Sequence, residues 1–121
     1  MQKKTYKLRF LPLFIEDLLE ITTYISSNLQ NPNAAYKLVD EIEDAIDKRL
    51  ENPFMFAPFN SKKPRINPYY RIYINNYTIF YVVIDDTMEV RRILYSKRNF
   101  DNILSIWLSK AKLKIKLIWN Q

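Results

Sequence analysis

Near the start of the chain, the spacing of the hydrophobic residues changes once, from every second residue to every third or fourth. Residues 6–10 alternate between apolar and basic side chains, which predicts a half-buried strand. Pro12 then suits the first turn of a helix. Apolar residues follow it at spacings of four, three and four, at Phe14, Leu18, Ile21 and Ile25. We therefore expect a strand followed by a helix that ends near residues 26–28.

A second helix is predicted directly after the first. Asn31 is a good N-cap, and Pro32 suits the first helical position. Asn52-Pro53 should end this helix, because the residue before proline disfavours helical geometry. One face is apolar, with Ala35, Leu38, Val39, Ile42, Ala45, Ile46 and Leu50. The short connection predicts that the two helices form an antiparallel hairpin.

From residue 69 onward the pattern predicts three short strands. Residues 53–68 form a proline-rich, aromatic loop before them. Tyr70, Ile72 and Ile74 then alternate with polar neighbours, and Asn75-Asn76 suits a tight hairpin turn. Residues 77–84 are apolar on both faces, as in a central strand, and residues 88–95 follow a turn at 85–87. Adjacent strands joined by tight turns predict an antiparallel meander.

Two neighbouring arginines in the last strand are expected on opposite faces. If alternation is strict, Arg92 shares a largely apolar face with Met88, Val90 and Leu94, and Arg91 lies on the other. We then expect Arg92 to pair with a carboxylate of the second helix.

The end of the chain predicts an extension of the same domain. Asp101 suits the cap of a third helix, and residues 112–119 begin with strict alternation of lysines and apolar residues, which indicates a strand or a docking tail. The expected fold is therefore α+β, in the order β-α-α-β-β-β, with a helical hairpin on a small, mainly antiparallel sheet. We divide it into a core over residues 1–104 and a basic, helix- or strand-like extension over 105–121.

Composition excludes several kinds of chemistry. The 121 residues contain no cysteine, histidine or glycine. Disulfides, thiolate or imidazole metal sites, Ser/His/Asp triads and glycine-rich phosphate loops are therefore impossible. We expect no cofactor and no metal. The start of the chain does not resemble a secretory signal and no segment is long and apolar enough to span a membrane, so we expect a cytoplasmic protein without a membrane partner.

The net charge of +6 is unevenly placed along the sequence. Residues 1–61 hold 7 Lys/Arg and 9 Asp/Glu, whereas residues 62–121 hold 12 and 4. A basic second half indicates an anionic partner such as nucleic acid or an acidic protein. The alternative is a solvated surface that serves solubility.

Two segments resemble the RelE/ParE superfamily, the small bacterial toxins of type II toxin–antitoxin pairs. Residues 76–86 (NYTIFYVVIDD) are similar to the family's central strand and turn, and residues 92–99 (RILYSKRN) to its last strand and trailing basic pair. The resemblance covers roughly residues 4–104. It implies a growth-inhibiting toxin that a cognate antitoxin neutralises.

The resemblance leaves the cellular target open. In the RelE-like branch the toxin is a metal-independent mRNA interferase that cleaves mRNA on the ribosome. In the ParE-like branch it inhibits DNA gyrase without chemistry of its own. Thr78 and Leu104 stand where the nuclease branch has an arginine and a tyrosine, which favours the second branch, while the basic loop and tail favour RNA binding. A degenerate toxin that only binds antitoxin is a third possibility.

The same resemblance supplies candidate site residues. For a nuclease, the catalytic candidates are Arg98, Lys97 and Tyr95. Side chains that contact RNA or phosphate are expected among the loop and strand cations, at Lys62, Lys63, Arg65, Arg71 and Arg91.

Overall fold

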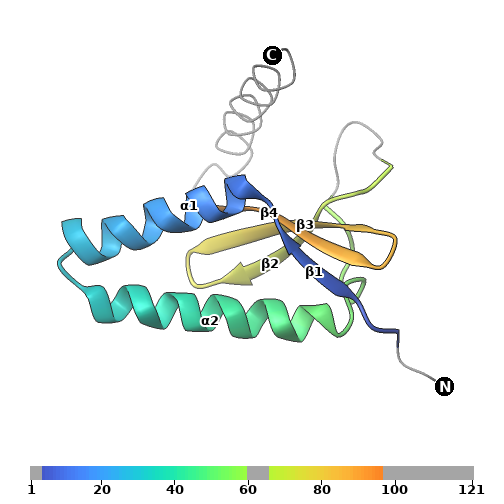
Figure 1. The fold of residues 1–121 in the computed structure, drawn as a ribbon, viewed down its shortest axis with the longest axis horizontal. Coiled ribbons are helices and arrows are strands. Elements are labelled where there is room, and N and C mark those ends of the chain that lie inside the picture. The colour runs from blue at the N-terminus through green and yellow to red at the C-terminus, as the bar shows by residue number, and fades with distance from the viewer. Residues whose placement is uncertain (1–3, 60–65, 97–121) are drawn as a thin grey trace, which may run out of the picture.

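The computed structural model describes residues 4–59 and 66–96, and Figure 1 shows their arrangement. The elements follow in the order β1 (Lys7–Phe10), α1 (Pro12–Thr23), α2 (Pro32–Leu50), β2 (Tyr70–Ile74), β3 (Tyr77–Ile84) and β4 (Thr87–Tyr95). The predicted β-α-α-β-β-β order is confirmed. The expected third helix, the strand at 112–119 and the boundary at residue 104 lie outside the described residues.

The four strands form one mixed sheet in the order β1-β4-β3-β2. β2, β3 and β4 pair antiparallel, as the meander requires. β1 pairs with β4 in parallel, at the edge of the sheet opposite β2. The sheet is therefore mainly antiparallel, as expected. Its parallel pair arises because the helical hairpin returns the chain to the opposite edge before the meander begins.

The two helices run antiparallel along one side of the sheet (Figure 1). α1 continues into a π-helical turn, η1 (Tyr24–Asn28), which confirms the expected end of the first helix. The Asn31 side chain then accepts a hydrogen bond from the amide of Ala34 at 3.1 Å and caps α2. Both predicted signals for the start of α2, the asparagine cap and Pro32, are confirmed.

The turns use residues other than glycine in left-handed backbone geometry. Asn75 has φ of 51° in the β2–β3 turn, Asp85 has φ of 55° in the β3–β4 turn, and Gln30 has φ of 50° between the helices. Asparagine and aspartate tolerate this region better than other residues with a side chain. A glycine-free chain therefore still forms two tight hairpins.

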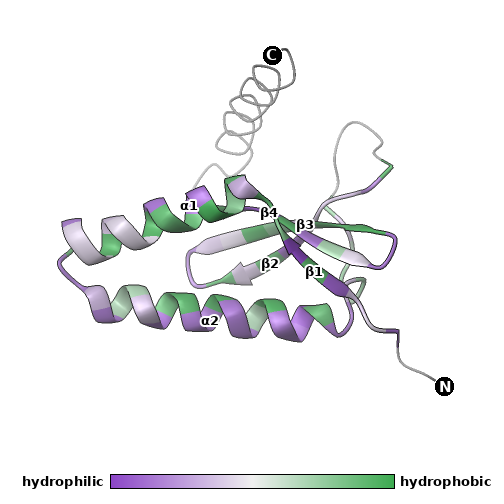
Figure 2. Ribbon diagram, viewed as in Figure 1, coloured by the Kyte–Doolittle hydropathy of each residue, from purple (hydrophilic) through white to green (hydrophobic). Residues whose placement is uncertain are grey.

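The main core lies between the helices and the face of the sheet that they cover, which we call the near face. It joins buried residues of both layers: Phe14, Leu38, Ile42, Ile46, Ile79, Tyr81, Val83, Met88, Val90 and Ile93. Hydrophilic residues of both helices alternate with these hydrophobic ones along the chain (Figure 2). The opposite side, the far face, carries the remaining β3 side chains, including Phe80.

One extra residue in β4 moves the side chains of its second half to other faces than expected. Val90 partners Tyr81, whereas Arg92 partners Phe80, so Arg91 has no partner in β3 and forms a β-bulge. Because Tyr81 and Phe80 lie on opposite faces, Arg92 lies on the far face and not beside Val90. The expected alternation through residues 88–94 is therefore wrong, because strict alternation ends at the bulge.

Candidate binding surface on the far face of the sheet

Two arginines flank a row of three aromatic rings on the far face. Phe80 of β3 packs edge-on against Phe59 of the loop and Tyr69, which precedes β2, with ring centroids 6.3 and 6.4 Å apart. The Arg71 guanidinium lies 4.9 Å from the Phe59 ring centre, and the Arg91 guanidinium lies 5.6 Å from that of Tyr69. Both arginines thus lie over ring faces, where cation–π attraction holds them. We call these five residues the arginine–aromatic row.

A buried carboxylate next to this row holds two arginines at once. Glu89 Oε1 accepts a hydrogen bond from Arg91 Nε at 3.1 Å, and Oε2 accepts one from Arg9 Nη1 at 3.3 Å. The Glu89 side chain is only 7% exposed, against 29% for Arg91 and 61% for Arg9. Arg91 also donates to the hydroxyl of Tyr69 at 3.1 Å. Arg91 is therefore fixed in one orientation by a carboxylate, a hydroxyl and a ring.

A second buried carboxylate, that of Asp17, lies along the part of the β4 edge that β1 leaves unpaired. β1 pairs only with the first part of β4, and α1 then runs beside the rest. Asp17 of α1 accepts hydrogen bonds from Arg92 Nε at 2.7 Å, Arg92 Nη2 at 2.8 Å and the amide of Ile93 at 3.2 Å. The expectation that Arg92 pairs with the second helix is wrong. The first helix supplies the carboxylate, because α1 lies along the edge to which the bulge directs Arg92.

Every cation of β1 and β4 lies in an ion pair. Besides the pairs of Arg9, Arg91 and Arg92, Lys7 lies 3.8 Å from Asp86. Arg71 of β2 differs, since it has no carboxylate partner among the residues that the structure describes. Its guanidinium instead lies between two rings, 4.9 Å from Phe59 and 5.5 Å from Tyr73, which is 64% exposed.

A buried tyrosine fixes the loop that leads to this surface. Tyr81 donates its hydroxyl hydrogen to the carbonyl of Pro53 at 2.6 Å and accepts a hydrogen bond from Arg49 Nη1 at 3.1 Å. Arg49 also donates to the carbonyl of Arg71 at 2.7 Å, which ties the end of α2 to the edge of β2. Burial raises the pKa of Tyr81 above its usual value of 10.0, and the hydrogen bond from Arg49 partly opposes this shift.

The structure brings together two of the predicted site residues and separates a third. Arg71 and Arg91 both lie on the far face. Tyr95 lies instead on the near face, at the end of β4, where its ring packs edge-on against Tyr77 at 5.6 Å. Burial and the neighbouring Tyr95 raise the pKa of Tyr77. The remaining candidates, Lys62, Lys63, Arg65, Lys97 and Arg98, lie outside the described residues, as does Leu104.

Thr78, at the position where the nuclease branch has an arginine, is fully buried on the far face. It lies between its strand partners Tyr73 and Leu94. Its hydroxyl oxygen has no hydrogen-bond partner within the described part of the chain. Thr78 therefore presents no reactive group at the surface of this face.

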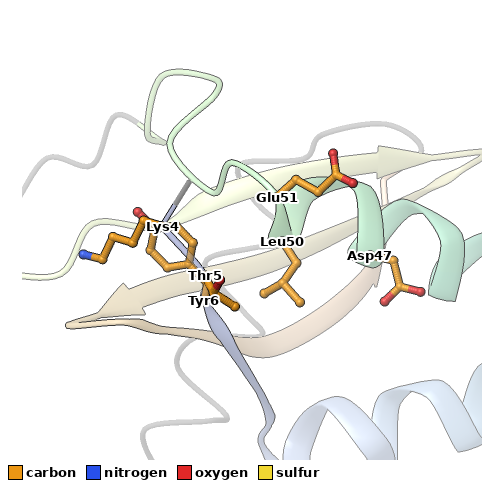
Figure 3. A pocket seen from close by; sticks show the side chains of 6 residues that line it. All are labelled: Lys4, Thr5, Tyr6, Asp47, Leu50 and Glu51. Atoms are coloured by element: carbon orange, nitrogen blue, oxygen red, sulfur yellow. The ribbon is translucent and has the colours of Figure 1, made fainter. Parts of the chain in front are cut away.

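A pocket of about 250 Å³ lies away from the row, between the N-terminal segment and the end of α2 (Figure 3). Its lining includes the apolar side chains of Tyr6 and Leu50 and the carboxylates of Asp47 and Glu51. Figure 3 shows the amine of Lys4 pointing away from both carboxylates. No group of three potential metal ligands occurs within residues 4–59 and 66–96, and no helix there is long and apolar enough to cross a membrane.

Two residues that organise the far face were not predicted from the sequence. Glu89 was signalled weakly, because Glu89 and Arg91 stand two apart in a predicted strand, a spacing at which side chains of one face are neighbours. Asp17 was not singled out as a site residue, because it is not among the apolar residues that define the stripe of the first helix. Its burial against Arg92 follows from the packing of α1 on an edge, which no local pattern reveals.

A helical hairpin on one face of a four-stranded sheet, with arginines and aromatic rings on the other, defines a small α+β protein. A family model described as "ParE toxin of type II toxin-antitoxin system, parDE" matches residues 8–100. The chain therefore belongs to the ParE toxin family, within the RelE/ParE superfamily of type II toxins.

Three similar solved structures were found, of which the first supports the fold. The chromosomal ParDE toxin–antitoxin system from P. aeruginosa contains a chain that is 17% identical, with a TM-score of 0.63, over 78% of this chain and 99% of that one. The RelB–RelE complex from Methanococcus jannaschii contains a chain that is 26% identical, with a TM-score of 0.43 and coverage of 78% and 96%. The archaeal RelE–RelB complex from Pyrococcus horikoshii contains a chain that is 17% identical, with a TM-score of 0.48, over 78% of this chain and 98% of that one. No curated protein matches the sequence significantly.

Proposed function

We propose that this toxin inhibits DNA gyrase by binding it, without cutting RNA. The observation that carries this proposal is that, on the described far face, the exposed hydroxyl of Tyr73 is the one proton-transfer group beside Arg71 and Arg91 that no arginine holds. Cleavage by a ribose 2′-hydroxyl needs one group to take a proton and another to give one. Both Glu89 oxygens are occupied by guanidinium groups, the Tyr69 hydroxyl accepts a hydrogen bond from Arg91, and Tyr95 lies on the other face.

Membership of the ParE family supports the same choice between the two branches. The ParE-like branch of the superfamily was expected to disable gyrase without chemistry of its own. A surface of fixed arginines and rings suits such a role, because arginine and aromatic side chains dominate the binding energy of protein interfaces.

A supercoiling assay tests the proposal. Purified toxin should inhibit gyrase, and Arg71→Ala should weaken this inhibition by about tenfold or more, as for a central interface residue. Lys37→Ala is the matched control, because it removes one positive charge from an exposed position on α2. Gyrase that supercoils DNA normally in excess wild-type toxin would exclude this function.

A cognate antitoxin is the second proposed partner. The three solved structures described above come from toxin–antitoxin pairs, and exposed apolar side chains lie on both helices, at Ile15, Leu19 and Tyr36. Such residues suit a partner segment that folds on binding. The product of a short neighbouring gene should co-purify with the toxin and restore growth when both are expressed. We place the action of the pair in the cytoplasm, where gyrase and its DNA are.

Ribosome-dependent mRNA cleavage is the alternative function, and one observation favours it. Ten of the 19 Lys/Arg residues fall in segments 1–3, 60–65 and 97–121, which also contain the catalytic candidates Lys97 and Arg98. RNA ends mapped after induction separate the two functions. Codon-specific cuts that disappear in Arg98→Ala would support cleavage, and intact mRNA at toxic doses would exclude it.

A further inference from the structure

The sheet is much less basic than the second half of the sequence suggests. Residues 66–96, which contain β2, β3 and β4, hold three arginines and three acidic residues, so their net charge is zero. The four cations of β1 and β4 pair with three carboxylates, those of Asp17, Asp86 and Glu89. The excess of positive charge therefore belongs to other segments of the chain.

Glu89 contributes most to this balance on the far face. It is buried between Arg9 and Arg91, with one carboxylate oxygen on each guanidinium. These ion pairs lower the local charge, and they occupy Nε of Arg91 and Nη1 of Arg9, while the Arg9 side chain stays 61% exposed. Arg91 is occupied further, since its Nη1 donates to Tyr69.

Arg71 is the described arginine of this face that pairs with no carboxylate. It lies between the rings of Phe59 and Tyr73 and has no carboxylate partner within residues 4–59 and 66–96. A single guanidinium beside exposed aromatic surface suits one carboxylate with an apolar neighbour, which is a protein-like ligand. Nucleic acid binds well only where several cations contact successive phosphates.

We infer that Glu89 determines the specificity of the far face, because it offsets the positive charge of Arg9 and Arg91 and holds Nε of Arg91, and so makes the face selective for an acidic protein segment over nucleic acid. The inference rests on the proposed function for the partner's class. Its test measures affinity for nucleic acid, so it fails or succeeds independently of the gyrase assay.

The test compares Glu89→Gln with Glu43→Gln in the full chain. Both variants raise the net charge by one, but Glu43 is exposed on α2, away from the far face. Binding of a short labelled duplex DNA and of a short labelled single-stranded RNA is followed by fluorescence anisotropy over a series of salt concentrations. Glu89→Gln should bind both about tenfold more tightly than wild type, with a salt dependence steeper by about one to two phosphate contacts. Glu43→Gln should stay within about twofold of wild type, because its charge lies elsewhere.

Equal affinities of Glu89→Gln and Glu43→Gln would overturn the inference. Adding Arg91→Gln to Glu89→Gln should remove much of the gain, whereas a full gain without Arg91 would count against it. If Glu89→Gln does not fold, Arg71→Gln and Arg91→Gln give a second comparison at equal charge. Arg71→Gln should weaken nucleic-acid binding more, and an equal or larger loss in Arg91→Gln would contradict the role given to Glu89.

Discussion

A single buried ion pair joins the first helix to the edge of the sheet. Asp17 and Arg92 are 6% and 8% exposed, and Asp17 accepts three hydrogen bonds. Asp17→Asn keeps the shape but removes the negative charge that faces the buried Arg92 guanidinium. We expect it to lower the free energy of unfolding by about 3 kcal/mol, as for a buried pair that loses one partner.

Urea denaturation measures this loss, and Glu20→Gln serves as the control. Glu20 is exposed on the same helix, so its neutralisation should change stability by no more than about 0.5 kcal/mol. If both variants unfold at the same urea concentration, the Asp17–Arg92 pair adds no stability beyond the effect of removing one negative charge from α1.

Because of Tyr81, we expect the stability of the fold to decrease at alkaline pH. Because burial raises its pKa, the unfolded chain loses this proton near pH 10.0 while the folded chain still holds it. The stability linked to the protonated hydroxyl is therefore fully present below that pH and is lost as the pH rises through the folded pKa. Urea titrations at increasing pH should show unfolding free energy falling above about pH 10.

Tyr81→Phe should be less stable at neutral pH by roughly 1–3 kcal/mol, because the carbonyl of Pro53 and the Arg49 guanidinium lose a partner. Its stability should then fall less steeply with alkaline pH than that of wild type. Tyr36→Phe, at a position 74% exposed, should keep the full pH dependence. A Tyr81→Phe slope identical to wild type would assign the alkaline loss to other groups.

At the scale of elements, the second helix depends on a local signal at its start. Asn31 accepts a hydrogen bond from the Ala34 amide, one of the amides that a helix leaves unpaired in its first turn. Asn31→Ala should lower the unfolding free energy by about 1 kcal/mol. Asn33→Ala, two residues later inside the exposed first turn, should leave it unchanged or slightly raised. Equal losses in both variants would show that the cap is not used.

Such local signals explain which elements could be predicted from the sequence. The cap at Asn31, the stops before Pro53 and the turn at Asn75 depend only on neighbouring residues, and the structure confirms them. The bulge at Arg91 depends on how β4 pairs with β3, so alternation read along β4 alone placed Arg92 on the wrong face. Periodicity predicts a strand well but predicts its faces only as long as no residue is inserted.

The candidate surface was only partly signalled by the sequence. Arg71 and Arg91 were named as candidates from residue type and strand position, and both lie on the far face, while their role in binding stays a prediction. The role of Glu89 requires knowing that β1 lies beside β4, which brings Arg9 to its second oxygen. Contacts between segments distant in the sequence are set by the order of the strands, and residue type alone cannot supply them.

At the scale of the whole molecule, the acidic and basic residues are unevenly divided between the described residues and the other segments of the chain. Residues 4–59 and 66–96 together hold 9 Lys/Arg and 12 Asp/Glu, whereas the other segments hold 10 and 1. A net charge of +6 therefore does not describe the sheet and its helices, which are acidic overall. Any general affinity for nucleic acid should depend on those other segments.

Replacing Lys110, Lys112, Lys114 and Lys116 with glutamine tests this separation. If these lysines contact phosphates, the slope of log affinity for duplex DNA against log salt should fall in magnitude by about 3 to 4, since each phosphate contact contributes about 0.9. The unfolding free energy of the core should not change. Four substitutions at the exposed acidic side chains Asp40, Glu43, Asp44 and Asp47 of α2, each to its amide, provide the control, because they change the net charge by the same amount in the other direction. A slope that survives the loss of the lysines would return nucleic-acid binding to the described part of the chain and weaken the case for a protein target.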